Sequence, residues 1–278
     1  MRKEFKNGVY DISSEDYHAS AGVSRSALMA MTKTPYHYYY EYLSGKARPR
    51  EATPAMITGE LVHTLVLEPL KYRDKFYVMP KLDKRTTAGK QLHAACLLEK
   101  DFRITVSEDQ VEEANAMANG VRENSVANVL IMENGKVEQS IYFTHEPTGL
   151  QCKVRPDSWT GSVIVDLKTS ADAGFRGFQS SAYKYGYYLQ AGMIYCGLKS
   201  IGIDMESFVF VVVEKSPPYA TAIYTLDPDA LDFGVNQFNE LMARLKHCCS
   251  EDKWPAFGIQ NLTVPKYALY DELVEIDE

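Results

Sequence analysis

The sequence predicts an α/β protein of the α+β type, in which a central mixed β-sheet is flanked by helices. Helical periodicity dominates residues 1–130, which predicts a mainly helical N-terminal part. From Val137 onward, short runs of alternating apolar residues predict strands, and a long helical stretch after the third run would carry the chain back to the sheet. We expect one domain over 1–278, with the sheet and its helix in 137–226 and a closing helix and tail in 227–278.

The composition is that of an ordinary globular protein, with 45% hydrophobic residues and a formal net charge of −7. This acidic total counts against nucleic-acid binding over the whole surface, although basic residues could line a channel while acids cover the outside. No apolar run approaches the ~18 residues of a membrane span, and the N-terminus MRKEFKNGVYDIS does not resemble a secretory signal. We therefore expect a cytoplasmic protein whose five cysteines are reduced.

The first helices lie within residues 24–43. Ser24 is suited to cap a helix with the sequence SRSALMAM, Pro35 ends it, and an aromatic-rich helix over Tyr36 to Leu43 follows. Most of these tyrosines are expected to pack in the core. Because a helix N-terminus is a ready phosphate site, Arg25 and Ser26 are candidates for contacting a DNA end.

Two further segments of the N-terminal part contain candidate functional residues. The apolar run Met56 to Glu68 predicts a helix that contains His63, and an isolated histidine of this kind is usually a buried core residue. After it comes the basic segment PKLDKRTTAGKQLH at residues 80–93, in which Arg85, Thr86 and Lys90 are candidate DNA contacts. Most charge runs are only solvated surface, yet this is the most basic local segment of an acidic protein, and its mixture of residues suits phosphate contacts. A helix over Glu108 to Glu123 ends the N-terminal part.

The second half alternates strands and helices. VEQSIYF, LQCKVR and SVIVDLKT predict three antiparallel strands, and SFVFVVVE and ATAIYTL predict two more. Helices are expected over Phe175 to Cys196 and over Pro228 to Cys248, and the tail from Trp254 contains a short strand pattern.

The stretch LQCKVRPDSWTGSVIVDLKT holds the polar residues with the clearest pattern. Its runs Gln151 to Arg155 and Val163 to Lys168 predict a β-hairpin joined by the turn-rich PDSWTGS. Residues i and i+2 of a strand share a face, so Asp166 and Lys168 project together, and Asp157 could lie beside them across the hairpin. Two carboxylates with an adjacent lysine can hold a hard divalent cation and present water to a phosphodiester. The alternative is an exposed cross-strand ion pair beside a turn aspartate.

These residues match a known motif. Pro156-Asp157, followed nine residues later by Asp166-Leu167-Lys168, resembles the PD-(D/E)xK nuclease superfamily. The segment GELVH, which ends at His63, resembles the G-x-x-x-H motif of the RecB-like branch, and Gln190 corresponds to the glutamine of its Q-x-x-x-Y helix motif. The chain departs from that motif, since residue 194 is Ile and the tyrosine is Tyr195. One residue is about 100° of helix rotation, so Tyr195 cannot simply take over the role of the family's tyrosine.

The likeness is closest to the nuclease domains of RecE-type exonucleases. The segments YDISSEDYH, RTTAGK, CKVRPD, VDLKT and DKWPA have counterparts there in the same order. This resemblance implies that Asp157, Asp166 and the Leu167 carbonyl coordinate Mg²⁺, that Mn²⁺ substitutes, and that His63 completes the site or holds a second ion. Lys168 would then orient or deprotonate a water, or neutralise the transition state. Glu68 is a weaker candidate for the outer part of the site.

The same resemblance implies a processive 5′→3′ exonuclease that acts on linear double-stranded DNA and leaves 3′ overhangs for a RecT-type annealing partner. It also implies a ring-shaped homo-oligomer, with four subunits expected before three. Three other functions use some of the same features: a restriction or repair endonuclease, a hydrolase of small phosphoesters, and a DNA-binding module without activity. The last would be expected to lack Asp157, Asp166 or Lys168, and all three are present.

Overall fold

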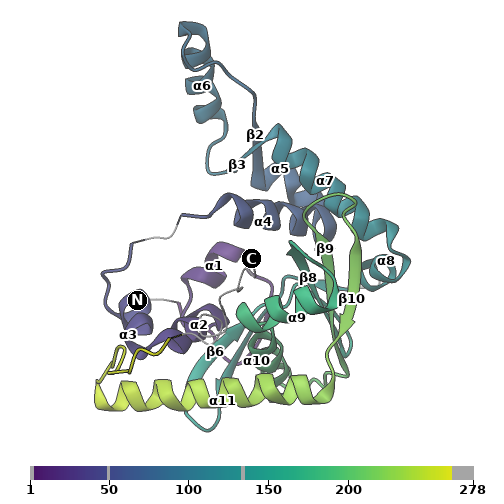
Figure 1. Cartoon of the computed structure of the whole chain (residues 1–278). Helices are drawn as coiled ribbons and strands as arrows, with labels where there is room; N and C mark the ends of the chain where they lie inside the picture. Colours follow the sequence, from purple (N-terminus) through teal and green to yellow (C-terminus); the bar gives the residue numbers. More distant parts are fainter. Residues whose placement is uncertain (1–2, 49–50, 133–134, 265–278) are drawn as a thin grey trace, which may run out of the picture.

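The computed structural model describes residues 3–48, 51–132 and 135–264. At its centre is a five-stranded mixed sheet of order β10-β9-β8-β7-β4 (Figure 1). Its strands are β4 (Lys136–Val137), β7 (Ser158–Thr160), β8 (Val163–Ser170), β9 (Ser207–Glu214) and β10 (Thr221–Thr225). Strands β8 and β9 are parallel and the other neighbours are antiparallel. The mixed sheet with helices on both faces agrees with the predicted fold class.

A second sheet of order β1-β5-β6 continues the first. It consists of β1 (Gly8–Tyr10), β5 (Ser140–His145) and β6 (Leu150–Val154). Ile141 lies opposite Val154 in the β5–β6 pair, and Val137 lies opposite Ser158 in the β4–β7 pair. The two strand pairs are therefore successive parts of one antiparallel ladder, with the same register. The chain therefore forms two long bent strands that pass from one sheet to the other. We call the point where they cross, at Glu138 and Asp157, the pivot; there the Glu138 N–H donates to the Asp157 carbonyl at 3.0 Å.

The predicted hairpin between Gln151–Arg155 and Val163–Lys168 is wrong in its pairing. Strand β6 pairs with β5, while the segment expected to be a turn contains β7, which pairs with β8. The reversal of direction occurs at Gly161, whose φ of +55° favours glycine. The prediction failed because Pro156 and Asp157, which look like turn residues, instead mark the bend at which the strand changes sheets.

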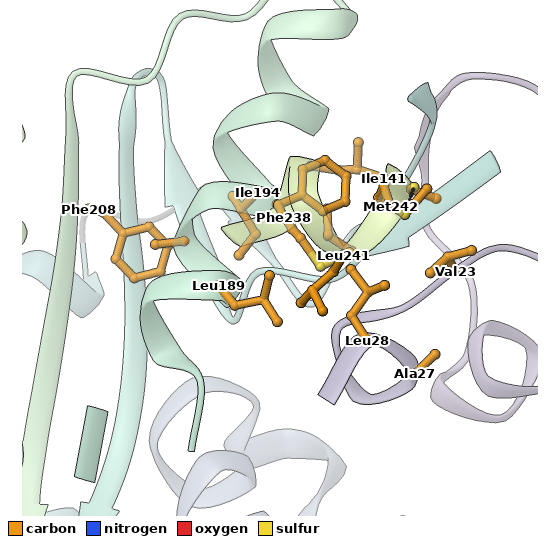
Figure 2. Packing of buried hydrophobic residues seen from close by; sticks show 14 of the residues in the cluster. Val23, Ala27, Leu28, Ile141, Leu189, Ile194, Phe208, Phe238, Leu241 and Met242 are labelled. Atoms are coloured by element: carbon orange, nitrogen blue, oxygen red, sulfur yellow. Dashed lines mark hydrogen bonds between the residues drawn. The ribbon is translucent and has the colours of Figure 1, made fainter. Parts of the chain in front are cut away.

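Alternate residues of β8 face two apolar clusters. Ile164 packs into a cluster with residues of α2 (Arg25–Lys33), α10 (Tyr187–Ser200) and α11 (Pro228–Glu251), while Val165 and Leu167 face a cluster with α4 (Pro54–Leu67) and α7 (Glu108–Glu123). Figure 2 shows the first cluster, in which Leu189 and Phe238 interlock between the strands and α2. Both faces of β8 are therefore buried, and any polar side chain on it needs a partner.

The remaining helices lie around this core. They are α1 (Ser14–Ala19), α3 (Pro35–Tyr38), a π-helical turn (Tyr39–Leu43), a 3₁₀ turn (Pro69–Lys71), α5 (Tyr72–Lys75) and α8 (Ser125–Met132). Ser24 caps α2 as predicted, since its side chain accepts from the Ala27 N–H. Within the described residues no helix is long and apolar enough to cross a membrane. The five cysteines are not paired in disulfides within the described residues.

Residues 76–107 form a separate projection, which we call the arm. It consists of β2 (Phe76–Met79), α6 (Thr87–Glu99) and β3 (Ile104–Ser107), with β2 and β3 parallel. Figure 1 shows α6 extending well away from the sheets. Only Cys96 of α6 is buried.

The single helix predicted over Phe175–Cys196 is two helices, α9 (Phe175–Lys184) and α10. They are separated at Gly186, where φ is +68° and an added Cβ would lie 2.4 Å from the Met29 sulfur. Apolar periodicity runs through this break, which is why the sequence predicted one helix. The tail prediction is also wrong where it can be tested: residues 254–264 form no strand, and residues 265–278 lie outside the described residues.

Candidate active site

The polar residues of the sequence motif meet at the pivot, where β7 stops pairing with β8. Asp157 takes the place of the missing strand partner, since its Oδ2 accepts a hydrogen bond from the Leu167 N–H at 2.8 Å. The N–H and C=O of one strand residue point to the same edge. The Leu167 carbonyl therefore faces the side of Asp157, as an ion ligand would need to.

Asp166 and Lys168 lie on the face of β8 that α10 covers. Asp166 is fully buried, and its Oδ1 accepts from Gln190 Nε2 at 2.6 Å, while its Oδ2 pairs with the Lys168 ammonium. The side chain of Lys168 is 15% exposed. Gln190 and Lys168 together fix the orientation of a carboxylate that an apolar sheet would otherwise leave unpaired.

His63 approaches from the opposite side, on α4. Its Nδ1 lies 3.5 Å from Asp157 Oδ2. One ligand atom each of His63, Glu138 and Asp157 falls within 4.8 Å of the others. The histidine that sequence statistics favour as a core residue is thus directed at the pivot.

Glu138 is the residue that the sequence analysis missed. It lies opposite Asp157 across the bent ladder, and its φ of +54° is uncommon for a residue other than glycine. Its Oε2 accepts from Arg155 Nε at 2.6 Å, and Arg155 also donates to the Ile12 carbonyl at 3.1 Å. A signal was available: pairing the strand VEQSIYF with CKVRPD in antiparallel register places Glu138 beside Asp157.

The two carboxyl groups at the pivot are difficult to ionise without a cation. Burial and the neighbouring Asp166 carboxylate raise the pKa of Asp157 to about 7. Burial and Asp157 also raise the pKa of Glu138, against the opposing effect of Arg155. Negative charge is therefore in excess here, which suits a divalent cation.

The two nitrogen bases respond in opposite directions. Burial and the Lys168 charge lower the pKa of His63, so the neutral imidazole that can bind a metal is favoured. Burial acts to lower the pKa of Lys168, but the Asp166 and Asp157 carboxylates outweigh it, and the net shift is upward. Lys168 is accordingly an ammonium group at neutral pH.

The donor set fits a divalent metal ion. It offers one imidazole, two carboxylates that share a pivot, and a backbone carbonyl beside them. The Gln190 Oε1 atom is buried without a hydrogen-bond partner, as expected where a metal-bound water would lie. Oxygen-rich ligation with one imidazole is typical of sites that accept Mg²⁺ or Mn²⁺.

The pivot opens into a cleft of about 1700 Å³. Glu138, His63 and Gln190 line it on the side of the sheet, and Arg25 and Ser26 line it at the N-terminus of α2. The two residues predicted to meet a DNA end therefore line the same cleft as Glu138 and His63, while Asp157, Asp166 and Lys168 lie behind its lining.

The remaining predicted residues lie elsewhere. Arg85 is 92% exposed on the arm and pairs with Asp83 at 3.0 Å, and the Thr86 hydroxyl caps α6 by accepting from the Gly89 N–H. Lys90 is exposed on the same helix, and none of these three lines the cleft. The two weaker candidates are also absent from the pivot, since Glu68 pairs with Lys71 at 2.5 Å and the ring of Tyr195 is covered by Lys199.

A protein family described as a "PDDEXK-like domain of unknown function (DUF3799)" matches residues 24–260. The chain belongs to this family. The match covers every residue of the pivot, and it bears out the predicted PD-(D/E)xK superfamily. Enzymes of this superfamily are nucleases that use divalent metals, and the pivot of this family member has the residues to hold one.

Two solved structures are similar to the chain. One is a protein of Eubacterium rectale provisionally described as an exonuclease, with a TM-score of 0.61 and 15% sequence identity, covering 95% of this chain and 100% of that one. At this identity the likeness shows a shared fold. The second, named SSO0001, has a TM-score of 0.28 and 15% identity over 68% of this chain and 87% of that one, and is too distant to support a conclusion. No curated protein matches the chain.

Proposed function

We propose that the protein is a Mg²⁺-dependent exodeoxyribonuclease that degrades linear double-stranded DNA. The observation that supports this best is the pivot, where Asp157, Asp166, Lys168, His63 and Gln190 meet although they come from four separate segments of the chain. Exposed charged residues rarely converge in this way, and buried ones are retained at functional sites.

The ion would be held by Asp157, Asp166 and the Leu167 carbonyl, with His63 and Glu138 completing the site. When bound, it polarises the scissile phosphate and acidifies its water. Lys168, an ammonium group in the metal-free protein, would neutralise charge on the phosphate and orient the attacking water. Gln190 holds Asp166 in place and presents its free Oε1 to the same region.

Arg25 and Ser26 are proposed to bind a phosphate of the DNA end. Both line the cleft at the N-terminus of α2, where the helix dipole and free N–H groups attract anions. The Arg25 Nε is buried without a hydrogen-bond partner, so the guanidinium has a donor left for a ligand.

The finer properties are proposed from the resemblance to RecE-type nucleases. These are 5′→3′ polarity, processivity, 3′ overhangs for a RecT-type annealing partner, and a homo-oligomeric ring around the DNA. A ring in which the arm residues Arg85, Thr86 and Lys90 face the channel would reconcile duplex binding with a net charge of −7.

The test is a nuclease assay on a linear duplex labelled at each 5′ or 3′ end in turn, with Mg²⁺ and with chelator. We expect Mg²⁺-dependent release of the 5′ label first, and no release with chelator. Early release of the 3′ label would reverse the polarity, and absence of any release over a range of Mg²⁺ and Mn²⁺ concentrations would refute the nuclease proposal.

An endonuclease of restriction or repair type is the second candidate, because the same motifs serve both activities. Closed circular DNA separates the two: an exonuclease leaves it intact, whereas an endonuclease nicks or linearises it. We expect the circular substrate to remain closed under conditions that degrade the linear form.

A further inference from the structure

An aromatic ring lies beside the charged residues of the site, and neither the sequence motif nor the family likeness gives it a role. Tyr187 lies three residues before Gln190 on α10, so the two side chains share one helix face. Its ring centroid is 4.8 Å from Lys168 Nζ and 5.7 Å from the Arg25 guanidinium carbon. Both distances are within the range of cation–π attraction.

Two features fix this ring in place. Phe178 and Phe210, both buried, pack against it with centroids 5.9 Å away. The chain enters α10 through Gly186 in the left-handed conformation, and the Arg25 guanidinium donates to the carbonyl of Tyr185, immediately before that glycine. Arg25 therefore stabilises the turn before α10 that positions the Tyr187 ring, and the ring in turn contacts the Arg25 guanidinium.

The other two tyrosines of α10 do not take this place. The ring of Tyr188 packs edge-on against Phe233, with centroids 5.8 Å apart. Tyr195 is half-exposed with Lys199 over its ring at 5.5 Å, and Ile194, at the position where the motif expects tyrosine, is buried in the apolar cluster. Tyr187 is thus the α10 tyrosine that reaches the lysine of the motif.

We propose that Tyr187 is a positioning residue whose ring holds the Lys168 ammonium and the Arg25 guanidinium in fixed directions. This inference rests on the proposed nuclease function. Lys168 is otherwise attracted by the Asp166 and Asp157 carboxylates, which would also serve the metal ion. The ring adds an attraction for the ammonium that binding of the ion does not remove. The ring face also lies close to both cations and reduces their mutual repulsion.

The test compares Tyr187→Phe, which keeps the ring, with Tyr187→Leu, which keeps apolar volume without it. Tyr195→Leu on the same helix is the control. In the nuclease assay on linear duplex, we expect the Phe variant and the control to stay within about threefold of the wild type. The Leu variant should lose about tenfold to a hundredfold in kcat through misplaced cations, with unchanged Mn²⁺ affinity.

An NMR measurement that does not depend on activity tests the ring contact separately from the proposed nuclease function. In the NMR spectrum of the metal-free protein, the terminal methylene protons of Lys168, assigned through Lys168→Arg, should be shifted upfield by the ring in the wild type and in Tyr187→Phe. They should return to ordinary positions in Tyr187→Leu. The proposal is overturned by full activity of the Leu variant, by equal impairment of the Phe and Leu variants, or by unshifted Lys168 protons in the wild type. An inactive wild type with shifted Lys168 protons would refute the nuclease function and leave the ring contact standing.

Discussion

The pivot and the arm hold their charged residues in different ways. At the pivot, Asp166 has 0% and Lys168 15% side-chain exposure, and each is fixed by named partners. On the arm, Arg85 is 92% exposed and pairs with Asp83, two residues away. Burying an unpaired charge is costly, so a buried charged cluster indicates a function, whereas exposed charges are common without one. The assignment of the pivot therefore rests on geometry, and that of the arm on charge alone.

The largest expected effect comes from removing the buried charges of the pivot. Asp166→Asn and Lys168→Ala should each lower the rate of linear-duplex hydrolysis by about a thousandfold or more, because in the proposed function both side chains act on the reacting phosphate or its ion. The exposed Lys199→Ala is the matched control and should be fully active. More than a tenth of wild-type activity in either pivot variant would place the chemistry elsewhere.

Glu138 provides a sharper test of how the pivot is built. Glu138→Gln keeps the size of the side chain but removes its charge, and we expect Mn²⁺ affinity to fall by about tenfold or more in a calorimetric titration. Glu68→Gln removes a carboxylate that lines the same cleft but pairs with Lys71, so it should not change the affinity. Equal affinities for both variants would remove Glu138 from the site.

The pH dependence of metal binding tests the charge imbalance at the pivot. Because the pKa of Asp157 is raised to about 7, this carboxyl is protonated below that pH in the metal-free protein and must lose its proton when the ion binds. We expect Mn²⁺ affinity to fall by about tenfold per pH unit from pH 7 towards 5, and to level off above pH 8. A constant affinity from pH 8 to 5 would show that Asp157 is already ionised throughout.

The smallest effect is expected on the arm. Arg85→Ala and Lys90→Ala should each weaken duplex binding a fewfold and reduce the slope of log affinity against log salt by about one, as expected for the loss of one phosphate contact. Mn²⁺ affinity should be unchanged in both. If neither variant changes the affinity or the slope, the arm does not contact the DNA backbone.

Much of the fold was predictable because local signals agreed with the packing. Ser24 caps its helix, and Glu108–Glu123 is a helix over the predicted bounds. The predicted strand SVIVDLKT corresponds to β8, and both of its faces are apolar around Asp166. The break at Gly186 and the bend at Asp157 were not predictable, because each is set by a distant contact. Gly186 leaves no room for a Cβ beside Met29 and follows a carbonyl that Arg25 binds, and Asp157 lies where the strand changes sheets.

The candidate site divides in the same way. Asp166 and Lys168 could be paired from strand periodicity alone, and the structure also brings Asp157, His63 and Gln190 to them. Glu138 could be found only by assigning the register across the bent ladder, since nothing in its own neighbourhood distinguishes it. Tyr187 required the left-handed turn before α10, which single-sequence patterns do not define.

The central claim is that the pivot binds a divalent ion, and a calorimetric titration of the metal-free protein with Mn²⁺ at pH 8 tests it most directly. We expect saturable binding by the wild type and loss of that binding in Asp157→Asn, whose side chain can still accept the Leu167 hydrogen bond. Equal binding by the wild type and the variant, or no saturable binding by the wild type, would contradict it.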